Sequence, residues 1–351
     1  MFNLRKKFKN EKGVALLVVL TLLTTVTLFG GGIIVISQTA RLATRATTGI
    51  SKFNLLAEGA ANRVKWVILW DKAQNNPRSL GNEKTIEKSE ELGFDRYIAD
   101  GRVYTMDYYG YDIDVWIKDA AAGLNFYTDK PSKVMDYFRK KYNDEGEGEQ
   151  NNNSEDSQEL LEQLDDFKKI LDDYVDENSL TGFQSMEKDE YSGQDMFPLP
   201  RDEVFVFRDE LLWLSNSEKF FRVDQFGQLS LVRIMPPEGL SAITASDNLF
   251  AVPLEYIQVM CNLGEEESTM VAEGIKQWLS EGTPIEEALE LELYTKVKGK
   301  FSFSESGFYT IKLRPGKKSQ VLIPGRILSE TVELGNSVQG EGFQFYEWAF
   351  Y

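Results

Sequence analysis

A long apolar run near the start of the chain constrains its fold more than any other feature. The run covers Val14–Ile36, which is 23 residues without a charged side chain. A helix rises about 1.5 Å per residue, so this run would extend about 34 Å and cross a hydrocarbon core of about 30 Å. Cleaved signal peptides have shorter apolar regions, of about 7–15 residues, that end at small residues. Here apolar residues 33–36 directly follow the glycines at 30–32, so we expect the segment to be kept as a membrane anchor.

The charges on either side of this run predict its orientation. Residues 1–12 carry a net charge of +4, from five basic side chains and one acidic one. The positive-inside rule therefore keeps this end in the cytoplasm. The whole chain has a net charge of −17, so the remainder carries −21. In a bacterium this acidic body would lie in the periplasm.

The composition argues against several classes of function. Histidine, the commonest general base and metal ligand, is absent. The single cysteine, Cys261, excludes an intrachain disulfide and a thiolate zinc cluster. The acidic body would repel the phosphate backbone of a nucleic acid, so we expect no nucleic-acid partner. These observations predict a protein that is not an enzyme and that requires no cofactor.

The boundary between the basic leader and the apolar run resembles a processing site. Residues 12–20, Lys-Gly-Val-Ala-Leu-Leu-Val-Val-Leu, are similar to the cleavage region of type IV pilin-like proteins. The resemblance implies that prepilin peptidase cuts after Gly13 and that Val14 becomes an N-methylated terminus. Most members of that superfamily have a glutamate at the fifth mature position, where this chain has Val18. In lacking it, the chain resembles the general secretion pathway protein K family, the K-type minor pseudopilins of type II secretion systems.

The uncharged residue at the fifth mature position has a physical explanation. A carboxylate in an apolar filament core is tolerated only when it is paired. In a pilin-like filament the expected partner is the charged N-terminus of the neighbouring subunit. A subunit at the tip has no neighbour ahead of it, so Val18 indicates a subunit that starts a filament.

The apolar pattern continues past the membrane segment at helical spacing. Apolar residues recur every three or four positions from Leu42 to Ile68, which predicts an amphipathic stalk helix over 37–70. We assign the charged residues between them to its polar face: Arg41, Arg45, Lys52, Glu58, Arg63 and Lys65. Each of the glycines at 30–32 costs about 1 kcal/mol in a helix interior. A bend or an unwound turn is therefore expected there.

The rest of the chain alternates between strand and helix patterns. Strands are predicted at Arg102–Tyr108 and Tyr111–Ile117, and again at 309–313, 321–323 and 342–350. Helices are predicted at 133–142 and 160–174, with a solvated loop over 143–158, and as a hairpin at 249–279 that resembles a SAM-like or helix-hairpin-helix unit. Asp119–Asn125 partly resembles the K-type motif at the entrance to a large insert. The fold class predicted is α+β, a pilin-like long N-terminal helix packed on an antiparallel sheet, with a large mainly helical domain inserted into the sheet region.

These patterns divide the chain into five parts. They are a prepilin leader at 1–13, a transmembrane helix at 14–36, the stalk at 37–70, a sheet body at 71–118 and 294–351, and the inserted helical domain at 119–293.

A group of carboxylates near the end of the predicted helix at 160–174 is the candidate cation site. Calcium prefers several oxygen ligands from carboxylates and carbonyls. The K-type resemblance also implies bound calcium, and the candidate ligands are Asp172, Asp173, Asp176 and Glu177. The loop spacing of an EF-hand is absent, so a solvated helix face is the other reading of the same residues.

The resemblance implies a structural protein of the bacterial inner membrane. Such a minor pseudopilin would cap the tip of the secretion pseudopilus and help to initiate its assembly for protein export across the outer membrane. Its partners would be the I-type and J-type minor pseudopilins, the H type as a further one, prepilin peptidase and the inner-membrane assembly platform. Two alternatives stay open. One is a minor pilin of a type IV pilus, and the other is a membrane-anchored periplasmic hydrolase that uses paired carboxylates.

Overall fold

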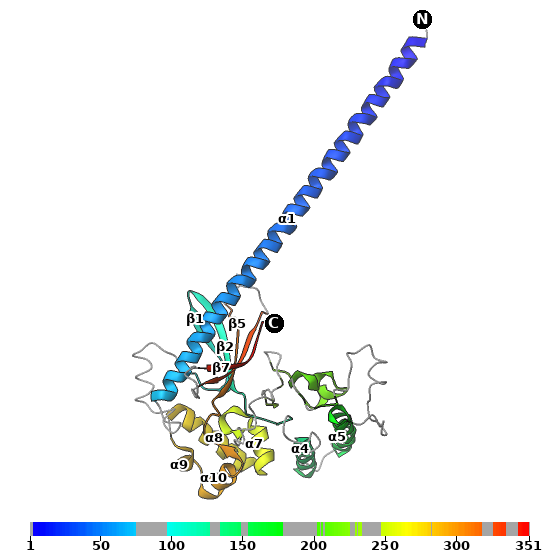
Figure 1. Ribbon diagram of the computed structural model, residues 1–351. Coiled ribbons are helices and arrows are strands. Elements are labelled where there is room, and N and C mark those ends of the chain that lie inside the picture. The colour runs from blue at the N-terminus through cyan, green and yellow to red at the C-terminus, as the bar shows by residue number, and fades with distance from the viewer. Residues whose placement is uncertain are drawn as a thin grey trace.

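The protein consists of a long N-terminal helix, a sheet that packs on its second half, and a helical head (Figure 1). The computed structural model describes residues 3–74, 97–126, 134–148, 154–177, 202–203, 205, 208–224, 229, 231–233, 247–281, 283–317, 326–334 and 343–350. The predicted α+β fold class is confirmed.

Helix α1 (Asn3–Gln74) is continuous over 72 residues. It runs straight through the glycines at 30–32, so the predicted bend there is wrong (Figure 1). A Cβ atom added at any of the three would meet no atom within 4 Å, so no neighbouring side chain interrupts the helix at this point. The long apolar segments on both sides favour helix, and the glycines do not end it. The helix also continues four residues past the predicted end at Trp70.

Five antiparallel strands form one sheet in the order β1-β2-β5-β6-β7. The strands are β1 (Asp100–Tyr108), β2 (Tyr111–Asp119), β5 (Phe308–Pro315), β6 (Leu328–Leu334) and β7 (Phe343–Phe350). β1 and β2 meet at a two-residue turn in which Tyr109 and Gly110 both have positive φ, 52° and 77°, as a tight hairpin requires. The strand predictions for β1, β2, β5 and β7 are confirmed, β6 was not predicted, and the strand expected at 321–323 lies outside the described residues.

The second half of α1 lies across one face of this sheet. Its inward side consists of Phe53 and small residues such as Ala57, Ala60 and Ala61, all 0% exposed. Alternate strand residues supply the other side of this core, among them Ile113, Ile311 and Val332. Small side chains let the helix approach the sheet closely, and close packing makes dispersion contacts dense. This layer joins α1 to the rest of the protein.

The head is the segment 120–307, which leaves the sheet after β2 and returns at β5, although these two strands pair with each other. Its apolar core is separate from the core between α1 and the sheet. Leu293, Val297 and Phe301 belong to the head core, and α10 (Leu291–Lys298) crosses the predicted boundary at 293–294. The sheet body therefore resumes only at Phe308.

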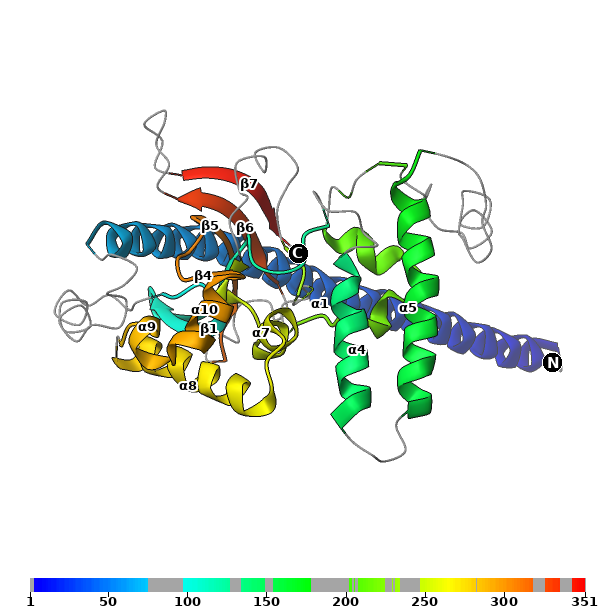
Figure 2. The same ribbon diagram turned by 90° about the horizontal axis from the view of Figure 1, so that it is seen from below.

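Helices α4 (Asp136–Gly148) and α5 (Ser154–Val175) lie side by side in one part of the head (Figure 2). Both enter the run 143–158 that we predicted to be a loop, so that prediction is wrong except at 149–153, which lie outside the described residues. Glutamate and glutamine, which make the run polar, are also good helix formers. Short 3₁₀ helices follow: η2 (Arg208–Trp213) and η3 (Ser217–Lys219).

The other part of the head is built around the predicted helical hairpin (Figure 2). α7 (Leu254–Cys261) and α8 (Glu265–Glu281) are joined at Asn262, which adopts a left-handed conformation with φ 51°. The remaining elements are β3 (Asp247–Asn248), η5 (Leu249–Ala251), α9 (Ile285–Ala288) and β4 (Phe301–Ser302), which pairs with β3. Phe250 of η5 stacks on Trp278 of α8 with ring centroids 3.7 Å apart.

Candidate functional site: an exposed apolar helix and a neck that holds the head

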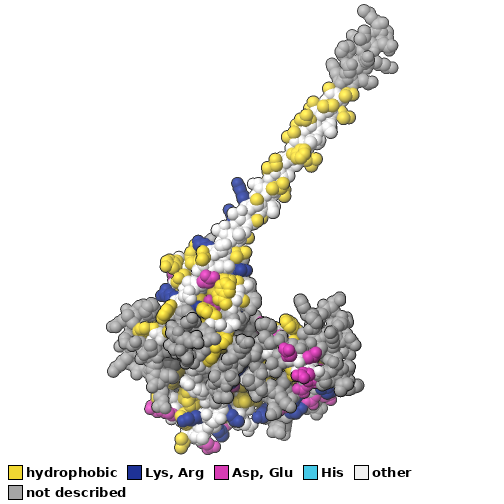
Figure 3. Space-filling model, viewed as in Figure 1, with side chains coloured by type: hydrophobic (Ala, Val, Ile, Leu, Met, Phe, Trp, Pro, Cys, Tyr) yellow, Lys and Arg dark blue, Asp and Glu magenta, His cyan; other side chains and the backbone are white. Residues whose placement is uncertain are grey.

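The first half of α1 has no tertiary contacts in the described structure. Every residue from 13 to 48 is exposed, and the first buried position is Gly49. Large apolar side chains are among them, such as Leu16 at 72% and Phe29 at 71% exposed. Figure 3 shows hydrophobic side chains along the part of the rod that lies farther from the head. Apolar surface on this scale requires a membrane or partner helices to cover it.

The predicted processing residues lie at the start of this exposed stretch. Gly13, Val14 and Val18 all lie within α1. Val14 and Val18 are 63% and 55% exposed, and a Cβ atom at Gly13 would meet nothing within 4 Å. α1 has a segment long and apolar enough to cross a membrane. Cleavage after Gly13 and methylation of Val14 stay predictions.

A buried ion pair fixes the second half of α1 to the sheet, and the sequence patterns missed it. Lys65 Nζ donates to Glu330 Oε2 at 2.8 Å, and the two side chains are 1% and 3% exposed. The ammonium also lies 4.3 Å from the centre of the Phe345 ring on β7. Burial raises the pKa of Glu330, although hydrogen bonding to Lys65 acts in the opposite direction.

Lys65 was assigned to the polar face of the stalk, and that assignment is wrong. The partner that makes its burial tolerable is on β6, 265 residues later in the chain. A buried charge is stable only when it is paired and hydrogen-bonded. Helical spacing alone contains no signal for such a distant partner.

The neck, defined as Asp119, Gly123, Arg233, Asp247, Asn248 and Ser306, brings together three passages of the chain between the sheet and the head. Asp119 at the end of β2 is 1% exposed. Its carboxylate accepts hydrogen bonds from Asn248 Nδ2 at 3.1 Å and from the Ser306 backbone N–H at 2.8 Å. The Ser306 hydroxyl donates to the same carboxylate at 2.5 Å. One carboxylate thus joins the entry, the middle and the exit of the insert.

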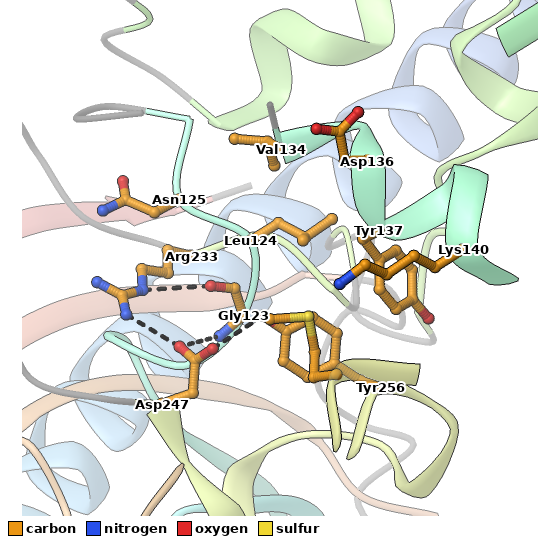
Figure 4. Close-up of a pocket in the computed structure, with 11 residues that line it drawn as sticks. Gly123, Leu124, Asn125, Val134, Asp136, Tyr137, Lys140, Arg233, Asp247 and Tyr256 are labelled. Carbon is orange, nitrogen blue, oxygen red and sulfur yellow. Dashed lines mark hydrogen bonds and ion pairs between the residues drawn. The ribbon is translucent and has the colours of Figure 1, made fainter. Parts of the chain in front are cut away.

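A second carboxylate completes the neck, as Figure 4 shows. Asp247 accepts from Arg233 Nη2 at 2.9 Å, from the Gly123 N–H at 3.1 Å and from the Tyr256 hydroxyl at 2.8 Å. Burial and the neighbouring Asp247 charge raise the pKa of Tyr256 far above its usual value, so this hydroxyl remains a donor. Gly123 has φ +109°, and a Cβ atom there would lie 2.4 Å from the Leu231 carbonyl oxygen. Only glycine fits this position.

A cavity of about 400 Å³ lies beside the neck, between α4 and α7. It is lined by Leu124, Tyr137, Tyr256 and Met260 together with charged residues, and Lys140 points into it from α4 (Figure 4). Both carboxylates on its wall are held by cations. Asp247 is paired with Arg233, and Asp136 with Lys168 at 3.0 Å. These two carboxylates therefore do not have the geometry of a catalytic pair, in which a free acid and a free base face each other.

The candidate calcium ligands lie at the C-terminal end of α5. Asp172 and Asp173 are in its last turn, and Asp176 and Glu177 follow directly. Acidic residues are unfavourable at this end of a helix dipole. Within the described part of the chain, no three carboxylates converge as metal ligands would. Calcium binding by these four residues therefore stays a prediction.

The comparisons with known proteins find similarity in structure but not in sequence. No family model matches the chain, and no curated protein matches it at a significant level. Among solved structures, a chain of the crystal structure of the GspK-GspI-GspJ complex from the enterotoxigenic Escherichia coli Type 2 Secretion System is similar. The match has a TM-score of 0.49 and 11% identity, and covers 88% of this chain and 98% of that chain. A likeness at this level assigns no function.

Proposed function

We propose that this chain is a non-enzymatic minor pseudopilin of the K type, which caps the tip of a type II secretion pseudopilus and helps to initiate its assembly. The observation that carries the proposal is the division of α1. Its first half contains the exposed apolar run, which begins directly after Lys12-Gly13, whereas one side of its second half is buried against a sheet. A helix of this design can be released from the membrane and packed beside others while its head remains folded.

The position of the head supports a place at the tip. The head lies at the end of the molecule opposite the N-terminus of α1 (Figure 1). In a filament of parallel helices, a bulky head at that end occupies the volume that the next subunit would need. Val18 supports the same reading, since a tip subunit has no neighbouring N-terminus to pair with a carboxylate at this position.

The proposed partners follow from the same role. The exposed apolar half of α1 would leave the inner membrane and pack with the helices of the I-type and J-type minor pseudopilins, and with the H type below them. Prepilin peptidase would process the cytoplasmic leader, and the assembly platform would extract the mature helix. The head and sheet would lie in the periplasm.

Processing is tested by mass spectrometry of the full chain recovered from membranes after co-expression with prepilin peptidase. The expected mature protein starts at an N-methylated Val14, and Gly13→Val, whose side chain would occupy the cleavage position, should keep Met1. An unprocessed wild-type chain in the presence of an active peptidase would contradict the proposal. A processed major pseudopilin in the same cells is the control for peptidase activity.

The tip role is tested by reconstitution with candidate I-type and J-type subunits. The wild-type chain should form a complex with them, whereas minor pilins of a type IV pilus should not compete. Val18→Glu should weaken the complex because it introduces a carboxylate without a partner into the apolar helix bundle. Val18→Leu, which keeps the apolar character, is the matched control. Equal complex formation by the glutamate and leucine variants would refute the tip assignment.

A further inference from the structure

Three basic residues lie on one face of α1 where it leaves the proposed membrane segment. Arg41, Arg45 and Lys52 fall within about 40° of one another around the helix axis, because successive residues turn by about 100°. All three are exposed. Figure 3 shows basic side chains on the part of the rod next to the head. Residues 37–57 contain these three cations and no acidic residue, within a body whose overall charge is strongly negative.

The helix around the two arginines touches no other described element. Residues 37–48 are all exposed, and they form a spacer about 18 Å long between the apolar run and the first buried residue. The threonines of this spacer bond to their own helix. Thr39 donates to the Val35 carbonyl at 2.9 Å and Thr44 to the Ala40 carbonyl at 2.8 Å. The arginine side chains are therefore the main outward-facing donors of the spacer.

The lipid headgroup layer lies at the height of Arg41 and within reach of the Arg45 side chain. Arg41 is five residues beyond Ile36, about 7.5 Å along the axis, and Arg45 is about 13.5 Å beyond it. The headgroup region extends about 5–8 Å past the hydrocarbon on each side of a bilayer. Long arginine side chains reach back toward such an interface. Lys52, about 24 Å past Ile36, lies too far out and instead places its ammonium 4.4 Å from the Tyr111 ring centre.

The arginines are also on the side where the positive-inside rule disfavours them. Basic residues near a membrane segment are enriched on the cytoplasmic side, where this chain already has its leader. A second basic group at the opposite end must be moved across the membrane during insertion. Guanidinium groups bind phosphate oxygens in a bidentate geometry. Binding to lipid phosphates would therefore explain why arginines lie on this side of the membrane.

We propose that Arg41 and Arg45 bind phospholipid phosphates on the far side of the membrane and hold α1 at a defined depth until assembly begins. The proposal rests on the membrane-anchored state of the proposed function. An acidic helix of a partner subunit is the competing occupant. The headgroup layer is favoured because the first cations after the apolar run are arginines: Arg41 lies at the height of this layer, and the long side chain of Arg45 can reach back toward it.

The test measures which lipids surround the spacer in the full-length protein. A bimane fluorophore is attached at Gln38→Cys in a Cys261→Ser background, and the protein is reconstituted into vesicles of mixed phosphatidylglycerol and phosphatidylcholine. One lipid or the other carries a doxyl quencher. Quenching by labelled phosphatidylglycerol should exceed quenching by labelled phosphatidylcholine. Arg41→Gln with Arg45→Gln should remove this preference, which corresponds to an affinity change on the order of fivefold for each arginine, and high salt should reduce it.

Lys52→Gln with Arg63→Gln is the matched control, because it removes the same charge farther along the helix and should leave the lipid preference intact. Resistance of the protein to alkaline extraction is measured on the same vesicles. Failure to insert would contradict the proposed anchor itself. Normal insertion with equal quenching by the two lipids would overturn only the lipid inference. The lipid inference would also be overturned if the arginine variants kept the lipid preference but no longer bound the partner subunits.

Discussion

The two halves of α1 have the same secondary structure and opposite surroundings. From residue 13 to 48 the helix exposes nearly all of its surface, whereas from 49 to 70 one side is buried against the sheet. The apolar run in the first half has large apolar side chains all around, whereas the buried side of the second half combines Phe53 and Val64 with small residues such as Ala57 and Ala60. A helix that is apolar all round is suited to a membrane or a helix bundle. Under the proposed function, one half of this continuous helix would serve assembly, while the other half stabilises the fold.

Two phenylalanines in the same helix test this difference most strongly. Phe53 is 0% exposed and meets Phe350 edge to face at 6.4 Å, whereas Phe29 is 71% exposed. Phe53→Ala should lower the free energy of unfolding by about 3–5 kcal/mol, because it leaves a cavity between α1 and the sheet. Phe29→Ala should change it by less than about 0.5 kcal/mol. Urea unfolding of the full chain in detergent micelles, followed by tryptophan fluorescence, measures both, and equal losses would contradict the division.

The buried ion pair extends the comparison to charges. Glu330→Leu leaves the Lys65 ammonium buried without its partner, and should cost about 3 kcal/mol of unfolding free energy. The double variant Lys65→Met with Glu330→Leu should recover most of that loss, because well-packed apolar residues often replace a buried pair at little cost. Arg45→Met, in the exposed half, is the control and should be neutral. A double variant as unstable as the single one would show that the pair does more than satisfy its own charges.

Glycines give a smaller contrast between the two halves. Gly31→Ala lies in open surroundings and should stabilise its helical segment by about 1 kcal/mol. At Gly59 an added Cβ would lie 2.4 Å from the Tyr108 hydroxyl, so overpacking should outweigh the gain in helix propensity and leave a net loss of about 1 kcal/mol. Amide hydrogen exchange around each position checks both signs. A gain at Gly59 would mean that Tyr108 moves aside without cost.

Sequence patterns predicted the elements whose causes are local. The apolar run, the β1–β2 hairpin around Tyr109 and Gly110, and the α7–α8 hairpin follow from periodicity and turn residues over short stretches. The burial of Lys65 and the neck around Asp119 depend on partners more than 100 residues away. Only the folded chain brings those partners together, so helical and strand periods could not reveal them.

The edge of the insert shows the same limit. Leu293 and Val297 have the spacing of an amphipathic helix, but spacing does not say which of two cores receives the apolar side. In the structure both side chains pack in the head core. The predicted boundary at 293–294 instead followed the change from helical to strand patterns in the sequence. For the processing site, in contrast, the sequence is more informative than the structure. Gly13 and Val14 are read from a short motif and a charge pattern, and their geometry within an exposed helix adds little to that reading.

The smallest effect that we expect is the pH dependence of the buried pair. Burial raises the pKa of Glu330 above its value in the unfolded chain, so between those two values the folded protein binds more protons than the unfolded one. Stability due to this group therefore falls as the pH rises through that window and is constant above it, with a slope of at most about 1.4 kcal/mol per pH unit. Glu330→Gln has no such titration, so subtracting its unfolding free energy from that of the wild type at each pH isolates the effect. A difference that rises with pH would mean that the Lys65 ammonium outweighs burial and that this pair is held together mainly by charge.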